Sequence, residues 1–358
     1  MRHAKSLACG AILAAGLMAA NADDFIPADD QRLEYSDYAV LEFVNDPAFP
    51  GQKLARLQRP LNSPGKGYNW DNPGARLRFA TDAAAVTVRL HYNDKHISTS
   101  ARNPVGLYYI DGRSADGWKF STAAKTTLRK PETVEMKLPS PGDGKAHDYE
   151  LVMPYGDSVD VVGVAVTDKA KFHPPKPRPS LRCAIYGDSI THGFTASHIG
   201  NTYAFKVAQL KNWQLVDLGI GGRAATAEDG TVVGKIACDR LVVLIGVNDW
   251  QGGRPVALYK QNIRQFIANF RKSQPKTPVT FITPLWVSPS WKPAAAKSGL
   301  EDYRQALRDA VREIADPAIS LVEGPELIDH DAKFFDPVAV HPNDAGFEIM
   351  ARRLAEKL

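Results

Sequence analysis

The first half of the chain consists of short apolar runs that alternate with polar positions and end at Gly, Pro or Asp. No long helical period interrupts these runs between about residues 35 and 167. Short β-rich runs at regular spacing are typical of the strands of an antiparallel sandwich. The predicted strands are residues 76–80, 86–92, 106–110, 133–138, 149–153 and 159–166. We therefore expect residues 23–168 to form an all-β sandwich domain with a jelly-roll-like or related arrangement.

After residue 180 the period changes, because strand-like apolar runs now alternate with amphipathic helical patterns. The predicted strands are residues 181–186, 214–218, 241–245, 279–283 and 319–322. Apolar positions recur at helical spacing over 256–270, over 300–314 and in a last segment from about Asn343. Five strands alternating with helices predict an α/β domain whose parallel sheet is covered on both faces. In such sheets the functional site lies beyond the carboxyl ends of the strands.

The segment between the two patterns, residues 169–180, reads KAKFHPPKPRPS and holds four prolines. Proline-rich polar stretches favour an extended, semi-rigid chain over regular structure. We therefore predict a linker at 169–180 between a β-sandwich domain at 23–168 and an α/β domain at 181–358.

The first 22 residues have the pattern of a secretory signal. Arg2 and Lys5 precede an apolar run over residues 7–20, and Ala20-Asn21-Ala22 has the small-x-small form of a cleavage site. A membrane anchor is the alternative, but the run is shorter than the ~20 residues that a spanning helix needs. We therefore expect cleavage near Ala22 and a secreted or periplasmic protein that does not stay in the membrane.

Composition agrees with two globular domains. The chain has 358 residues, of which 44% are hydrophobic and 23% charged, and its formal charge of +4 falls to +2 without residues 1–22. Basic runs interleaved with aromatics are lacking, so we expect no nucleic-acid partner. Cys183 and Cys238 remain after cleavage, and an oxidising compartment would allow them to pair. Their spacing does not suit a metal, and we expect neither metal nor cofactor.

Candidate chemistry follows three consecutive strands. The first strand leads into Asp188-Ser189, the second into a glycine-rich turn containing Gly222, and the third into Asn248-Asp249. Each alone suits an ordinary turn or helix cap. Together they fall at one edge of a parallel sheet, where side chains converge. A fourth piece, His341, lies in the loop directly before the last helix.

These four blocks, in this order, resemble the SGNH hydrolases, also called GDSL esterases, over roughly residues 180–358. The resemblance implies a flavodoxin-like domain in which Ser189 is the nucleophile and His341 the base. It also implies an oxyanion hole made of the N–H groups of Ser189 and Gly222 and the side chain of Asn248. An α/β-hydrolase fits poorly, because Ser189 does not lie in a G-x-S-x-G elbow.

One position departs from the family pattern. The family usually has an aspartate three residues before the histidine, where this chain has Val338. Two readings stay open. Asp336 reaches His341 and completes a triad, or a backbone carbonyl orients the imidazole and the enzyme works as a dyad. An ordinary loop residue before a proline is the alternative role of Asp336.

The layout of a β-sandwich before an SGNH domain resembles carbohydrate esterases, especially the second family of these enzymes. This resemblance implies removal of short acyl groups, most simply acetyl, from an acylated carbohydrate through an acyl-enzyme. Three tryptophans follow predicted strands of the sheet: Trp250, Trp286 and Trp291. They either stack on a sugar ring or pack in the core or at the rim of the domain. A lipase or thioesterase, an acyltransferase and a non-catalytic carbohydrate-binding protein are the alternatives.

Overall fold

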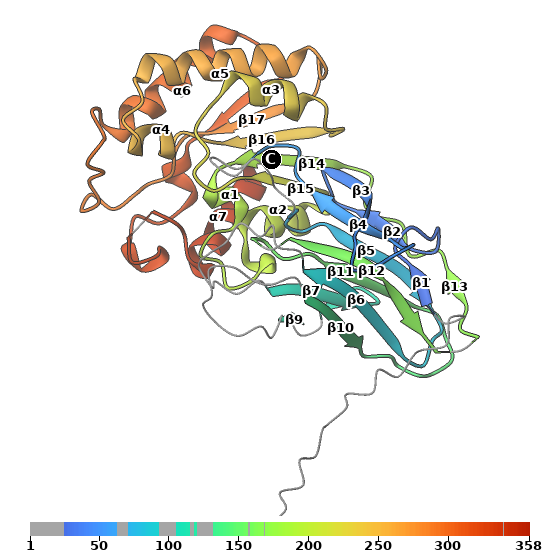
Figure 1. Ribbon diagram of the computed structural model, residues 1–358. Helices are drawn as coiled ribbons and strands as arrows, with labels where there is room; N and C mark the ends of the chain where they lie inside the picture. Colours follow the sequence, from blue (N-terminus) through green and yellow to red (C-terminus); the bar gives the residue numbers. More distant parts are fainter. Residues whose placement is uncertain are drawn as a thin grey trace, which may run out of the picture.

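The computed structural model describes residues 25–62, 71–92, 105–114, 118–119, 132–156, 158–167, 169–338 and 340–358. The predicted signal at residues 1–22 lies outside these ranges. Figure 1 shows two domains packed side by side, one made of strands alone and one in which helices surround a sheet. Within the described part of the chain, every helix falls short of the length and apolarity that a membrane span requires.

The described residues of the N-terminal domain form two antiparallel sheets. The first contains β1 (Phe25–Pro27), β3 (Val40–Asn45), β4 (Lys53–Gln58), β6 (Val86–Tyr92), β10 (Glu132–Leu138) and β12 (Val159–Val166). The second contains β2 (Glu34–Ser36), β5 (Arg76–Thr81), β7 (Val105–Ile110), β8 (Arg113–Ser114), β9 (Trp118–Lys119), β11 (His147–Val152) and β13 (Phe172–His173). The prediction of an antiparallel β-domain is therefore confirmed.

The core of this domain lies between the two sheets. Leu77 and Phe79 of β5 meet Val88 and Leu90 of β6, and all four side chains are fully buried. Phe79 also stacks on Tyr149 of β11 at a centroid distance of 5.2 Å. Residues i and i+2 of a strand point to the same face, so the alternation in the sequence supplies one apolar face per sheet. The jelly-roll-like connectivity stays a prediction.

The proline-rich segment is more ordered than its composition predicts. Phe172–His173 pair with Thr81 and Ala80 of β5 and so extend the second sheet. Further along, Arg178 donates to both carboxylate oxygens of Asp37, at 2.8 and 3.1 Å. These contacts bind the segment to the β-domain, so the extended chain predicted here is in part an edge strand.

The C-terminal domain contains a five-stranded parallel sheet. Its strands are β14 (Arg182–Gly187), β15 (Gln214–Gly219), β16 (Arg240–Leu244), β17 (Val279–Ile282) and β18 (Ile319–Val322). They lie in the order β15-β14-β16-β17-β18, and all neighbours pair in parallel. This is the flavodoxin-like order. The predicted sheet is confirmed.

Helices cover both faces of this sheet. They are α1 (Ser189–His192), α2 (Tyr203–Lys211), α3 (Ala227–Gly234), α4 (Val247–Gln251), α5 (Val256–Arg271), α6 (Leu300–Ile314) and α7 (Asp344–Lys357), with short 3-10 turns η2 (Ile199–Asn201), η3 (Gly324–Leu327) and η4 (Ala332–Phe334). In Figure 1, α3, α5 and α6 lie on the far side from the β-domain, and α2 and α7 lie on the other. The three amphipathic patterns of the sequence correspond to α5, α6 and α7.

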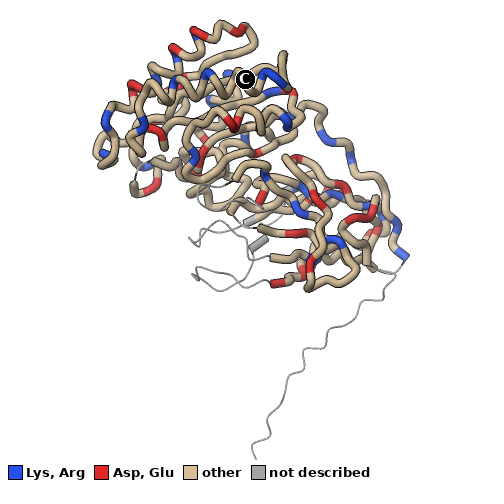
Figure 2. The backbone as a smooth tube through the Cα atoms, turned by 45° about the horizontal axis from the view of Figure 1, so that its top comes forward, with Lys and Arg blue, Asp and Glu red and all other residues tan. Residues whose placement is uncertain are grey.

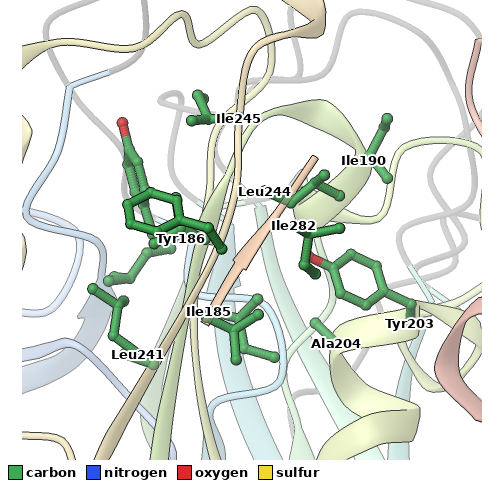
Figure 3. Close-up of a cluster of buried hydrophobic side chains, with 14 of the residues drawn as sticks. Ile185, Tyr186, Ile190, Tyr203, Ala204, Leu241, Leu244, Ile245 and Ile282 are labelled. Carbon is green, nitrogen blue, oxygen red and sulfur yellow. The ribbon is translucent and has the colours of Figure 1, made fainter. Parts of the chain in front are cut away.

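Consecutive residues of the central strand fill the two layers of the core (Figure 3). Tyr186 points to one side and stacks on Phe266 of α5 at a centroid distance of 5.2 Å. Ile185 points to the other side, where Ile190 and Tyr203 lie. Because both faces of the sheet are buried, the strands read as nearly continuous apolar runs.

Polar contacts join the two domains. Asp37 of the β-domain accepts a hydrogen bond from the backbone N–H of Leu215 on β15 at 2.8 Å, and Tyr155 donates to the carbonyl of Ala196 at 2.6 Å. Acidic and basic positions are interspersed over both domains (Figure 2). Cys183 and Cys238 are free thiols, so the pairing that the sequence permits is not formed.

Candidate active site

Ser189 stands at the carboxyl end of the central strand as the first residue of α1. Asp188 caps this helix, because its Oδ1 accepts from the N–H of Ile190 at 2.9 Å. The turn needs Gly187, since a Cβ there would overlap the side chain of Thr191 and the carbonyl of Leu244. Ser189 itself is half-buried. The strand end therefore presents the hydroxyl at the rim of the sheet.

His341 reaches the same rim from the loop before α7, whose first turn is capped by Asn343. The Oγ of Ser189 lies 2.9 Å from the Nε2 of His341, although 152 residues separate them in the chain. The imidazole edge also meets Phe194, with ring centroids 4.7 Å apart. The structure thus brings together the two residues predicted as nucleophile and base, at a distance that permits proton transfer.

Asp336 lies on the other side of the imidazole. Its Oδ2 is 3.3 Å from Nδ1 of His341, and its Oδ1 accepts from the backbone N–H groups of Val340 and His341 at 3.1 and 3.4 Å. An antiparallel bridge between Phe335 and Pro342 folds the loop back on itself. Val338, at the position that usually holds an aspartate, is 57% exposed. Asp336 therefore contacts the histidine, through a hydrogen bond longer than usual for a charged pair.

The glycine-rich turn and the Asn248 block also meet at this rim. Gly222 is exposed, and its φ of +75° is a conformation that favours glycine. Asn248 donates from Nδ2 to the carbonyl of Arg223 at 3.0 Å. That amide nitrogen has a second N–H that the contact does not use. The Arg223 guanidinium binds Asp229 at 2.6 Å and the carbonyl of Asn62 in the β-domain at 2.9 Å. The roles of Gly222 and Asn248 in an oxyanion hole stay predictions.

Three buried carboxyl groups lie below the rim. Burial raises the pKa of Asp188 to about 7, and the nearby Asp249 adds to the shift. Burial likewise raises the pKa of Asp217 to about 7 and that of Asp249 to about 6. These groups consequently carry less negative charge near neutral pH than surface aspartates do. They cap turns: Asp217 accepts from the N–H of Gly219 at 2.7 Å and Asp249 from that of Ala225 at 2.9 Å.

The tryptophans differ in their surroundings. Trp250 is buried, donates to the carbonyl of Ser298 at 3.0 Å and packs edge-on against Trp291. Trp286 is half-buried and stacks on His330 with an interplanar angle of 8°. Trp250 is therefore a core residue and is not exposed for stacking on a sugar ring.

Sequence reasoning missed two neighbours of the proposed catalytic pair. Phe194 touches the imidazole, and its place in a loop without periodicity gave no signal. His192 is buried and binds Asp71 of the β-domain at 2.8 Å. No pattern within one domain could identify that partner. Among the residues that the structure describes, no group of three or more His, Cys, Asp or Glu side chains is placed to hold a metal ion.

Known proteins share this architecture. A profile of the GDSL-like lipase/acylhydrolase family matches residues 185–349. A salicylyl-acyltransferase from a tetracycline biosynthetic pathway has a TM-score of 0.72 and 20% identity, over 93% of this chain and 96% of that chain. A family two carbohydrate esterase from Cellvibrio japonicus has a TM-score of 0.67 and 15% identity, over 93% and 96%. One from Clostridium thermocellum, in complex with cellohexaose, has a TM-score of 0.68 and 15% identity, over 91% and 97%.

At these identities the structural neighbours show a common fold, whereas the profile match gives a family for residues 185–349. No curated protein sequence matches the chain significantly. The protein is a carboxylic ester hydrolase. Residues 185–349, most of its α/β domain, match the GDSL-like lipase/acylhydrolase family, the SGNH hydrolases that the four sequence blocks resemble.

Proposed function

We propose that the protein is an exported serine esterase that removes short acyl groups, most simply acetyl, from an acylated carbohydrate. The contact of 2.9 Å between Ser189 Oγ and His341 Nε2 carries this proposal. A hydroxyl in that position can lose its proton to the imidazole as it attacks an ester. The apolar segment and small-x-small site at residues 1–22 support export.

The reaction proceeds in two acyl transfers. Ser189 Oγ attacks the ester carbonyl carbon while His341 Nε2 takes its proton, and the carbonyl oxygen becomes an oxyanion. The Ser189 and Gly222 N–H groups and the Asn248 amide stabilise that charge. The tetrahedral intermediate then breaks its bond to the sugar oxygen, which leaves with the proton from His341. Water, deprotonated by His341, then attacks the carbonyl carbon of the acyl-serine. The second tetrahedral intermediate breaks its bond to Ser189 Oγ, which takes the proton back from His341 as the carboxylic acid is released.

The substrate class rests on the two-domain architecture and on the loops at the rim. The family two carbohydrate esterases match over nearly their whole length, β-domain included, and one of them was solved with cellohexaose. The loops after the first three strands are small and polar, GFTASHIGN, GGRAATAEDG and WQGGRP. A long acyl chain would need a continuous apolar groove, so these loops favour a short acyl group on a polar molecule.

A second candidate is acyl transfer to an alcohol other than water. The salicylyl-acyltransferase has the same two-domain architecture and the highest TM-score among the neighbours described above. Both reactions share the acyl-enzyme and differ only in the acceptor. Added alcohol that diverts most of the acyl group from water to a new ester would identify a transferase.

The test uses protein that begins after residue 22, with para-nitrophenyl esters of increasing chain length. We expect hydrolysis that is fastest for acetate and is abolished in Ser189→Ala. Ser290→Ala is the matched control, because Ser290 is an exposed serine on the loop after β17. Acetate release from a panel of acetylated polysaccharides then identifies the sugar. Undiminished turnover by Ser189→Ala would refute the assignment.

A further inference from the structure

Residues 192–197, which begin at the last residue of α1, touch both the β-domain and the loop of His341. We propose that the β-domain positions the general base through this segment, with Asp71 and Thr195 as positioning residues for acyl transfer. The inference rests on the proposed function, because it assigns the two residues to the geometry of the Ser189–His341 pair. It gives the β-domain a part in catalysis besides any contact with substrate.

The first anchor is a buried charged cluster on the β-domain side. The Asp71 side chain is fully buried and accepts from Arg59 Nη2 at 2.5 Å, from the N–H of Gly156 at 3.0 Å and from His192 Nε2 at 2.8 Å. Burial alone would raise the pKa of Asp71, but Arg59 and His192 hold it well below its usual range. Burial lowers the pKa of His192. A fixed carboxylate thus holds the last residue of α1, three positions after Ser189.

The second anchor is Tyr155, also from the β-domain. Its hydroxyl donates to the carbonyl of Ala196 at 2.6 Å, and its ring packs edge-on against the imidazole of His192 at 5.7 Å. Both ends of the segment are therefore attached to the β-domain by buried groups. The residues between these ends, Phe194 and Thr195, have little freedom to move away from the loop they face.

The contacts to the His341 loop lie between and beside these anchors. Thr195 Oγ1 lies 2.7 Å from the carbonyl oxygen of Pro342, one residue past the base, and shares its proton between that carbonyl and the carbonyl of Phe194. The N–H of Ser197 donates to Asp344 Oδ1 at 2.7 Å, and the Phe194 ring meets the imidazole of His341. Two of these contacts reach the loop, and the third reaches Asp344, the first residue of α7. They hold the imidazole where its Nε2 faces Ser189.

The backbone of residues 192–197 is strained at Thr195, the residue that contacts Pro342. Thr195 has a φ of +83°, in the left-handed region that a β-branched residue rarely adopts. Such a conformation persists only when the surrounding structure fixes it. Here the Pro342 carbonyl and the two β-domain anchors supply that constraint. Loss of an anchor would let the turn relax and take Pro342, and with it His341, away from Ser189.

The test is a double-mutant cycle on kcat in the full mature protein with para-nitrophenyl acetate. We expect Asp71→Asn and Thr195→Val each to lower kcat by about five- to tenfold, the effect of losing one hydrogen bond, with KM unchanged. Thr195→Ser keeps the hydroxyl and should restore most of kcat. The double variant should lose clearly less than the product of the single losses, because both residues act through one segment.

Asp160→Asn is the matched control. Asp160 is fully buried and binds Arg56 through two hydrogen bonds of 2.7 and 2.9 Å between paired strands of the first β-sheet. The Asp160→Asn substitution should lower the thermal midpoint of unfolding and leave kcat unchanged. If Asp71→Asn does not fold, Tyr155→Phe replaces it in the test. That change removes only the hydroxyl that binds the carbonyl of Ala196, and it should lower kcat without changing KM.

Three results would overturn the proposal: folded variants with kcat within twofold of wild type, an equal loss of kcat in Asp160→Asn, or full additivity in the cycle. Failure of the proposed function looks different. In that case the wild type itself would not hydrolyse the ester, or Ser189→Ala would retain activity. The two proposals can therefore fail separately.

Discussion

Replacing Asp336 with asparagine tests whether the carboxylate orients the imidazole. Asparagine keeps an oxygen that can accept from the N–H groups of Val340 and His341, so the loop should stay folded. The change removes the charge that faces Nδ1 at 3.3 Å. Its new N–H₂ group can instead face Nδ1, which favours the tautomer whose Nε2 carries the proton. That tautomer cannot accept the proton of Ser189.

The size of the effect follows from the contact. A hydrogen bond to a charged group contributes about 1.5–3 kcal/mol, and the length of this one favours the lower end, or about a tenfold change in rate. Inversion of the tautomer would increase the loss toward the ~10⁴ known for the corresponding change in a triad. We therefore expect kcat to fall at least about tenfold in Asp336→Asn, with little change in KM.

The assay is steady-state hydrolysis of para-nitrophenyl acetate, together with thermal unfolding to show that the variant folds. Asp331→Asn is the matched control, because Asp331 is an exposed residue of the same loop that caps η4. It should have wild-type kcat. A value for Asp336→Asn within about threefold of wild type, in a folded protein, would refute the triad and leave a dyad.

Three further predictions concern other parts of the molecule. Asn248→Ala should lower kcat by about 10²–10³-fold with KM nearly unchanged in the same ester assay, since it removes an oxyanion donor; an unchanged kcat would exclude that role. Hydrogen bonds to two aspartates, Asp111 first, raise the pKa of His147. Its contribution to stability should therefore be complete below the ordinary histidine pKa of about 6.5 and be lost as the pH rises through the raised value. The difference in thermal midpoint between wild type and His147→Gln should shrink in that direction, and a difference that grows would contradict it. Gly230→Ala should destabilise the protein to urea, because the new Cβ would overlap the carbonyl oxygen of Phe266; the ~1 kcal/mol gain usual for alanine in a helix would contradict this packing.

Much of the candidate site could be predicted from sequence because its parts follow parallel strands. The carboxyl ends of such strands meet at one edge, so Ser189, Gly222 and Asn248 could be placed there before any geometry was known. Asp336 could not be decided in the same way. Its approach to His341 depends on the bridge between Phe335 and Pro342, and loop pairing of that kind leaves no periodic signal.

The β-domain shows where pattern reasoning fails. The six predicted strands exist, but the strands of two or three residues and two longer ones, β3 and β4, were missed. In β3 the side chains are exposed or half-buried, so no apolar alternation marks it, and β4 is nearly all buried but contains Arg56 and the short Ala55. The contacts between the two domains also could not be predicted from the sequence. Asp71 and His192 are 121 residues apart, and neither lies in a segment with a periodic apolar pattern.

The pairing of Phe172–His173 with β5 also affects how the protein can be divided. A cut after residue 180, the end of the predicted linker, would leave the edge strand and Arg178 with the N-terminal fragment. The hydrolase fragment would lose Asp71 and Tyr155, which hold residues 192–197, and Asn62, whose carbonyl binds Arg223. Truncation and domain-exchange designs should therefore treat both domains as a single engineering unit.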